Sequence, residues 1–95
     1  GKIIARVRAI NPSATFLVAQ IIPNASSGGD LVALNREIEK LAALSTEASR
    51  VVIVDQYSGF VFETDTWDGL HPNKSGNEKM AIRWFDAVNR TLTAR

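Results

Sequence analysis

The sequence predicts an α/β fold with a parallel sheet. Residues 14–22 and 51–54 are apolar runs rich in branched side chains, which is typical of strands covered on both faces. A long stretch with helical periodicity lies between the two runs. Because a strand, a crossover helix and a second strand form a right-handed unit, the two runs are expected to pair in parallel.

The first half of the chain alternates helix and strand. Residues 2–10 carry apolar side chains at helical spacing until Asn11-Pro12 stops the pattern, which predicts a helix. Residues 14–22 are the first predicted strand, which Pro23 closes before a loop. Asp30 is the expected N-cap of a long helix over residues 31–49.

The second half contains a strand, an irregular segment and a helix. The strand over residues 51–54 ends at Asp55, and residues 57–74 then show no clear periodicity. The last helix is expected to begin at Ser75, with Glu78 completing a capping box. Each predicted helix has an apolar stripe that is expected to face the core. The stripes are Ile3, Ile4, Val7 and Ile10; Leu31, Leu34, Ile38, Leu41 and Ala48; and Met80, Trp84, Phe85, Val88 and Leu92.

Two predicted strands do not make a complete sheet. Each would leave an unpaired edge, and no capping residue precedes the first apolar pair of the first helix. We therefore expect further strands, either from oligomerisation through the sheet or from a preceding part of the domain on another polypeptide.

Composition argues against several classes of partner. The net charge is +1 and the two signs are interspersed, which gives no electrostatic reason to bind nucleic acid or an anionic membrane. No apolar run approaches the roughly 20 residues that a transmembrane helix needs. The absence of cysteine excludes disulfides within the chain. Three glycosylation sequons, at Asn24, Asn73 and Asn89, favour a secreted, extracellular protein.

The irregular segment contains the only histidine of the chain, His71. Sites in open parallel sheets form where strands end, and this segment follows the second strand. Pro72 favours an extended His71, and a turn at Gly69 would bring Asp68 within hydrogen-bond reach of Nδ1. Such a contact would leave Nε2 free to accept a proton from a nucleophile, so the two residues form two thirds of a Ser-His-Asp triad.

Other roles for neighbouring residues stay open. Asp65 is an alternative partner for the histidine, and Asp55, at a strand end, is expected to bind loop N–H groups. Trp67 borders the site and would either stack on a sugar ring or pack under the loop. A metal site built from Glu63, Asp65, Asp68 and His71 fits by ligand type, but its spacing matches no strong pattern, so we expect neither metal nor cofactor.

The stretch TWDGLHPNKSGNEKMAIRWFDAV resembles the last motif block of the SGNH hydrolases, also called GDSL esterases and lipases. In that block an Asp-x-x-His-Pro sequence precedes the C-terminal helix. ATFLVAQIIP and VVIVDQ are similar to the late strands of the same family. Within the superfamily, the chain most resembles the acetylxylan esterases of carbohydrate esterase family three. The resemblance implies that residues 1–95 are the C-terminal part of one flavodoxin-like domain, a three-layer α/β/α sandwich.

The resemblance also implies groups that this chain lacks. In the family, a serine in a Gly-Asp-Ser sequence is the nucleophile, and a glycine and an asparagine complete the oxyanion hole; neither motif occurs here. We expect the N-terminal segment of the same domain, as a separate chain, to supply them, while this chain supplies His71 and Asp68. The implied reaction is the deacetylation of a polysaccharide such as xylan. Hydrolysis of lipids or small esters, and a non-catalytic interaction module, are the alternatives.

Overall fold

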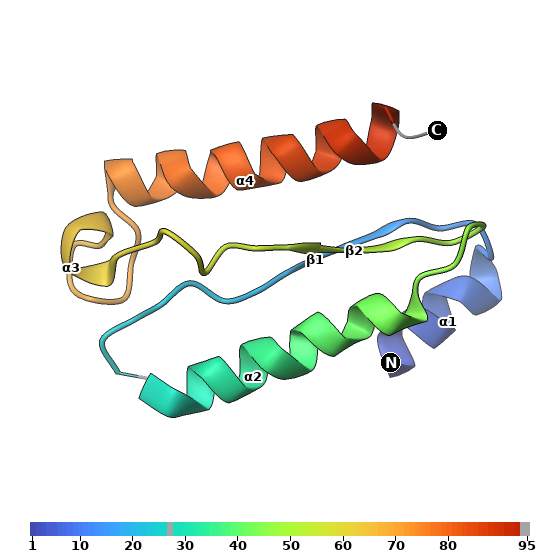
Figure 1. Ribbon diagram of the computed structural model, residues 1–95, viewed down its shortest axis with the longest axis horizontal. Helices are drawn as coiled ribbons and strands as arrows, with labels where there is room; N and C mark the ends of the chain where they lie inside the picture. The colour runs from blue at the N-terminus through green and yellow to red at the C-terminus, as the bar shows by residue number, and fades with distance from the viewer. Residues whose placement is uncertain (27, 94–95) are drawn as a thin grey trace.

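A computed structural model describes residues 1–26 and 28–93, which form three layers (Figure 1). Helix α4 lies on one side of two strands, and helices α1 and α2 lie on the other side (Figure 1). The elements, in chain order, are α1 (Lys2–Ile10), β1 (Phe16–Ala19), α2 (Gly28–Lys40), the 3-10 helix η1 (Leu41–Leu44), β2 (Val51–Val54), α3 (Phe62–Asp65) and α4 (Lys74–Thr93).

The two strands pair in parallel, which confirms the predicted strand–helix–strand unit. Their register places Phe16 beside Val51 and Ala19 beside Val54. Strand β1 is shorter than the predicted strand over residues 14–22, because beyond it the backbone of Ile21 bonds to a helix. The Ile21 N–H donates to Asn35 Oδ1 at 2.7 Å, and the Asn35 amide donates back to the Ile21 carbonyl at 2.9 Å.

Helix α2 begins and ends earlier than predicted. It starts at Gly28, so Asp30 lies in the first turn and is not the N-cap. After Lys40 the chain tightens into η1 and then leaves the helical path, which corrects the predicted end at residue 49. Hydroxyl side chains explain this end, since they compete for backbone groups that a helix would use. Ser45 Oγ accepts the N–H of Val51, and Thr46 Oγ1 accepts the N–H of Ser49.

The predicted apolar stripe of α2 is only partly buried. Leu31 and Asn35 are the buried positions of the helix, whereas Leu34 is exposed.

Helix α1 matches the prediction over its whole length and is held by one arginine. The Arg8 guanidinium donates to the hydroxyl of Ser49 at 2.8 Å and to the carbonyl of Ser49 at 2.7 Å. Only Ile4 of its apolar stripe is buried, while Ile3 and Ile10 are exposed.

Helix α4 begins at Lys74, one residue before the predicted start. Asn73 is its cap, because Asn73 Oδ1 accepts the N–H of Gly76 at 3.0 Å. The predicted capping box at Ser75 is therefore wrong, and the Ser75 hydroxyl donates to Asp65 at 2.7 Å instead.

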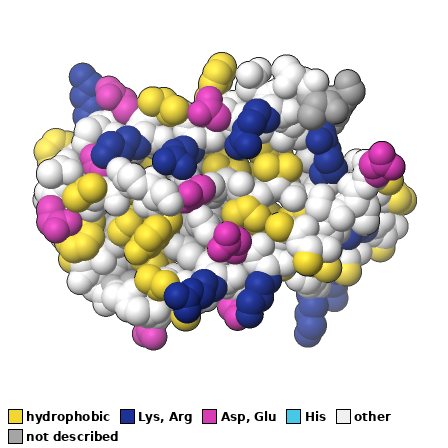
Figure 2. Space-filling model, in the orientation of Figure 1, with side chains coloured by type: hydrophobic (Ala, Val, Ile, Leu, Met, Phe, Trp, Pro, Cys, Tyr) yellow, Lys and Arg dark blue, Asp and Glu magenta, His cyan; other side chains and the backbone are white. Residues whose placement is uncertain are grey.

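The predicted buried stripe of α4 is also wrong. The buried residues of the helix are Gly76, Ala87 and Thr91, and Phe85 is 69% exposed. Trp84, Val88 and Leu92 are exposed as well, and Met80 is half-buried. A sheet of two strands covers only the small-residue face of the helix. Figure 2 shows hydrophobic side chains over the strands, between α4 and α2.

The segment between β2 and α4 is more ordered than its sequence indicates. It contains the short helix α3 and an antiparallel bridge between Thr66 and Pro72. Phe60, Asp65 and Thr66 are buried there. Within the part of the chain that the structure describes, no helix is both long and apolar enough to cross a bilayer.

Candidate active site

Asp68 and His71 are joined by a tight turn that ends in a side-chain contact. Asp68 Oδ2 lies 2.6 Å from His71 Nδ1, which confirms the predicted hydrogen bond. The other carboxylate oxygen, Oδ1, accepts the backbone N–H of Leu70 at 3.0 Å and of His71 at 2.7 Å. The turn requires a positive φ of 85° at Gly69, a backbone conformation that glycine adopts readily.

These contacts keep Asp68 ionised. The backbone N–H of His71, then its imidazole, and then the N–H of Leu70 hold the pKa of the Asp68 carboxyl well below its usual range. Because an ionised carboxylate has no proton to donate, Nδ1 of the neutral imidazole must carry the hydrogen. Nε2 is then the acceptor nitrogen, which is the tautomer that a general base needs.

The imidazole is accessible from solvent. The side chains of His71 and Asp68 are 71% and 53% exposed. Among the described residues, the His71 ring has a hydrogen bond only with Asp68. A nucleophile for this base must therefore come from outside the described contacts.

Backbone contacts fix the turn from two directions. On one side, the N–H of Trp67 donates to the His71 carbonyl at 3.0 Å, and the N–H of Gly69 donates to Thr66 Oγ1 at 2.8 Å. On the other side, the loop after β1 reaches the turn, where the N–H of Ala25 donates to the Gly69 carbonyl at 2.8 Å. The loops that follow both strands thus meet at the candidate site.

Trp67 lies beside this turn with its side chain in solvent. It is 79% exposed, so it does not pack under the loop. The exposed indole leaves a flat apolar surface next to His71 along the chain.

Asp65 is not the partner of His71. It is only 2% exposed, and its carboxylate accepts the N–H of Val61, the hydroxyl of Ser75 and the ammonium of Lys79. The hydrogen bond from Lys79, followed by those from Val61 and Ser75, lowers the Asp65 pKa to about 2. Among the described residues no group of three or more His, Asp or Glu side chains could hold a metal ion, so the four candidate ligands do not converge.

Asp55 binds loop N–H groups, as predicted. Its Oδ1 accepts the N–H groups of Tyr57 and Ser58, and Arg83 lies 3.7 Å from its other oxygen. Burial raises the Asp55 pKa, but the hydrogen bonds from Ser58 and Tyr57 and the charge of Arg83 outweigh it and lower the pKa overall.

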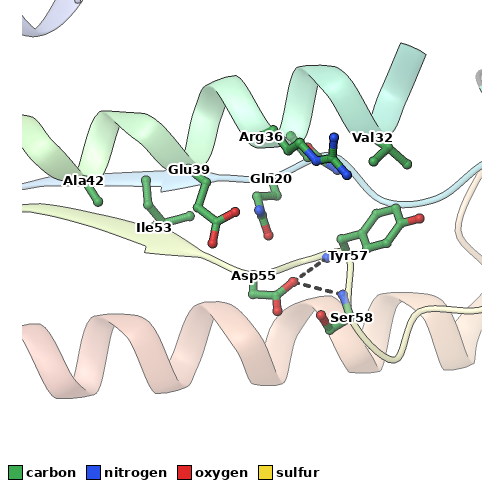
Figure 3. A pocket seen from close by; sticks show the side chains of 10 residues that line it. Gln20, Val32, Arg36, Glu39, Ala42, Ile53, Asp55, Tyr57 and Ser58 are labelled. Carbon is green, nitrogen blue, oxygen red and sulfur yellow. Dashed lines mark hydrogen bonds between the residues drawn. The ribbon is translucent and has the colours of Figure 1, made fainter. Parts of the chain in front are cut away.

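A pocket of about 540 Å³ opens beside Asp55, between α2 and the ends of the strands. Gln20, Arg36, Glu39 and Tyr57 line it, together with Asp55 (Figure 3). This pocket was not predicted from the sequence. The available signal was that Gln20 and Asp55 are the first residues after the two paired strands, which places them at the same sheet edge.

Comparison with known proteins gives one consistent family. No family model matches the chain. Over 69 residues, or 73% of its length, the chain is 33% identical to a multidomain esterase of Ruminococcus flavefaciens, of which it spans 9%. It is 28% identical to a carbohydrate esterase family 3 protein from Talaromyces cellulolyticus, with a TM-score of 0.84, covering 97% of this chain and 46% of that one.

A second solved structure gives the same result. It is a serine-to-alanine mutant of an acetyl esterase with acetate ion, and it is 29% identical with a TM-score of 0.84. The match covers 96% of this chain and 45% of that one, so the chain spans less than half of each solved relative. By sequence and fold together, the chain has the features of the C-terminal portion of an SGNH hydrolase similar to carbohydrate esterase family 3.

Proposed function

We propose that the protein that contains this chain is a carboxylic ester hydrolase with a Ser-His-Asp triad, to which residues 1–95 contribute His71 and Asp68. The observation that carries the proposal is the 2.6 Å contact between Asp68 and His71 Nδ1 on an accessible turn. The similarity to a multidomain esterase and to carbohydrate esterase family 3 supports the reaction class.

In the proposed mechanism His71 moves a proton twice. Its Nε2 accepts the proton of a serine hydroxyl as that hydroxyl attacks the ester carbonyl, and it then donates this proton to the leaving alcohol. Water then takes the place of the alcohol: it gives a proton to Nε2 as it attacks the acyl-serine, and His71 returns this proton to the serine oxygen as the acid leaves. Asp68 remains ionised throughout, orients the ring and stabilises the imidazolium. The lowered pKa of Asp68 suits this role, since the carboxylate does not compete for the proton.

The serine and the oxyanion-hole donors are proposed to come from the N-terminal segment of the same domain, as a separate chain. The coverage of only 46% of a solved relative supports a contribution from residues outside 1–95. The exposed faces of α4 indicate where such a segment would pack. Arg83, Asp86 and Arg90 line a groove with Ile53 of β2, whereas the apolar residues Trp84 and Val88 lie on another side of the helix. Because the charged side of α4 lies beside β2 and its apolar residues lie on another side, we expect further strands to add beyond β1 and not beyond β2.

The proposed substrate is an acetylated polysaccharide such as xylan, and the protein is proposed to be secreted. Trp67 would stack on a sugar ring near the scissile ester, because an exposed indole offers the flat face that sugar rings bind. The acetate ion in the related acetyl esterase structure supports an acetyl group as the acyl part.

The test is hydrolysis of acetyl esters by the protein reassembled from this chain and the segment with the nucleophile. We expect His71→Ala and Asp68→Asn each to lower kcat by about 10²–10⁴-fold, which is the range for loss of acid–base catalysis. Asp30→Asn is the matched control, because Asp30 is an exposed aspartate of α2 far from the turn in sequence, and it should leave kcat unchanged. Undiminished hydrolysis by His71→Ala would contradict the proposal.

Two rival functions give different results in the same assay. A hydrolase of lipids or other small esters would prefer longer acyl chains over acetyl. A non-catalytic interaction module, which the exposed apolar faces of α1 and α4 would suit, would show no hydrolysis in any form although the reassembled protein is folded.

A further inference from the structure

The first turns of α4 hold a buried carboxylate at the base of the turn that carries Asp68 and His71. Lys79 Nζ donates to Asp65 Oδ2 at 2.7 Å and also to the Gly59 carbonyl at 3.0 Å. The Ser75 hydroxyl donates to Asp65 Oδ1 at 2.7 Å. Gly76 lies so close that a Cβ there would overlap the Asp65 carbonyl. Helix α4 and the segment 59–65 are thus joined through Asp65.

The backbone of Asp65 connects this attachment to the turn that carries Asp68 and His71. Its carbonyl accepts the N–H of Asn73 at 2.9 Å, and the next residues, Thr66 and Pro72, form the antiparallel bridge. The side-chain amide of Asn73 also donates to the Thr64 carbonyl at 2.9 Å. Both ends of the segment 66–72 are therefore anchored next to Asp65, and their position depends on the position of Asp65.

This attachment matters because, among the described residues, the side chains of Asp68 and His71 form hydrogen bonds only within the turn itself. They are more than half exposed, and among the described residues the imidazole bonds only to Asp68. The direction in which Nε2 points is set by the backbone of the turn. A displacement of about 1 Å in a catalytic group can cost on the order of 100-fold in rate.

We propose that Asp65 and Lys79 are a positioning pair, which fixes the Asp68–His71 turn on α4 so that the imidazole meets the serine hydroxyl and the leaving alcohol. Neither residue is a catalytic residue, since neither contacts the reacting atoms in this mechanism. Loss of the Lys79 charge would leave the buried carboxylate without its cation, and the segment 61–73 would rearrange to hydrate it. The lowered pKa of Asp65 is consistent with a pair that stays charged.

Because this role rests on the proposed ester hydrolysis, the test separates the two. In the reassembled protein, Lys79→Met is compared with Lys79→Arg, which keeps the charge, and with Lys40→Met. Lys40 is the matched control, since it forms a 2.8 Å ion pair with Glu37 on the exposed surface of α2. We expect Lys79→Met to lower kcat by about 10–100-fold with KM nearly unchanged. Lys79→Arg should restore most of kcat, and Lys40→Met should have no effect.

A comparison of two acetyl esters distinguishes a displaced imidazole from a loss of folded protein in Lys79→Met. Nitrophenolate leaves an ester without protonation, whereas an alkyl alcohol needs the proton that His71 delivers. A displaced imidazole therefore lowers kcat/KM, which reports acylation, more for an alkyl acetate than for nitrophenyl acetate, while partial unfolding lowers both equally. Equal losses on the two esters, or an unchanged kcat, would overturn the positioning role while the wild-type activity and its need for His71 still stand.

A milder variant decides the matter if Lys79→Met does not fold. Ser75→Ala removes one donor to Asp65 and leaves the ion pair in place. We expect a smaller loss of kcat, by about 3–10-fold, with the same greater loss on the alkyl ester. A folded Ser75→Ala protein with wild-type kcat on both esters would refute the proposal. If wild-type protein itself hydrolyses neither ester, both the proposed function and the positioning role fail.

Discussion

Replacing Gly69 with alanine should destabilise the protein and slow hydrolysis, and Gly59 provides a matched control. Both glycines have a positive φ, 85° at Gly69 and 79° at Gly59. Their surroundings differ. A Cβ at Gly69 would lie 2.8 Å from the Cβ of Ala25, whereas a Cβ at Gly59 would meet only the end of the flexible Arg83 side chain at 3.6 Å.

The expected losses follow from these distances. The backbone strain of an alanine at positive φ costs about 1–2 kcal/mol at either position. At Gly69 the overlap with Ala25 adds about 1–3 kcal/mol, a typical cost of overpacking. We therefore expect Gly69→Ala to lower the free energy of unfolding by about 2–5 kcal/mol, and Gly59→Ala by about 1–2 kcal/mol.

Chemical denaturation of the two variants, combined with turnover of an acetyl ester, checks this expectation. A third protein with both Ala25→Gly and Gly69→Ala should regain the part of the free energy of unfolding that is lost through overpacking, because it removes the overlapping methyl group. Its stability should approach that of Gly59→Ala. The reasoning is refuted if Gly69→Ala and Gly59→Ala lose equal stability, or if Ala25→Gly gives no recovery.

Two further predictions concern Asp65 and Trp67. The folded-state pKa of Asp65 is about 2, below its ordinary value of 3.8, so its contribution to stability is complete above the ordinary value and is lost as the pH falls towards 2. In acid denaturation, the stability gap between wild type and Asp65→Asn should therefore narrow over this range, and a constant gap would contradict the assignment. Trp67→Ala should change stability by less than about 0.5 kcal/mol, because the side chain is exposed. It should raise KM for acetylated xylan but not for a small acetyl ester, and an equal KM change on both would exclude sugar stacking.

The local part of the site could be predicted from sequence alone. Asp68 and His71 are three residues apart with a glycine between them, so a single tight turn decides their contact. The parallel pairing of β1 and β2 was also predictable, because a helix joins two apolar runs.

The role of Asp65 could not be predicted in the same way. Its side-chain partners Ser75 and Lys79 are 10 and 14 residues away, and their meeting depends on how α4 folds back. The end of α2 was missed because hydroxyl groups at Ser45 and Thr46 compete for backbone N–H groups, which apolar periodicity does not reveal.

The stripe of α4 shows a different limit. Its apolar periodicity correctly predicted a helix, but the chain buries the adjacent face with Ala87 and Thr91 instead. A pattern of apolar residues tells which face of a helix is suited to burial, and not which segment covers it. Trp84 and Phe85 are both exposed in the part of the chain that the structure describes.

Asn35 connects helix α2 to the candidate site through the loop after β1. The Asn35 side-chain amide forms hydrogen bonds with both the N–H and the carbonyl of Ile21, as a neighbouring strand would. These bonds determine where the chain leaves the sheet. Four residues later, Ala25 reaches the carbonyl of Gly69. A substitution that rotates α2 would shift this exit point and, through the loop, the orientation of the imidazole. Engineering of the proposed activity could therefore begin at a position of α2, outside the turn that carries Asp68 and His71.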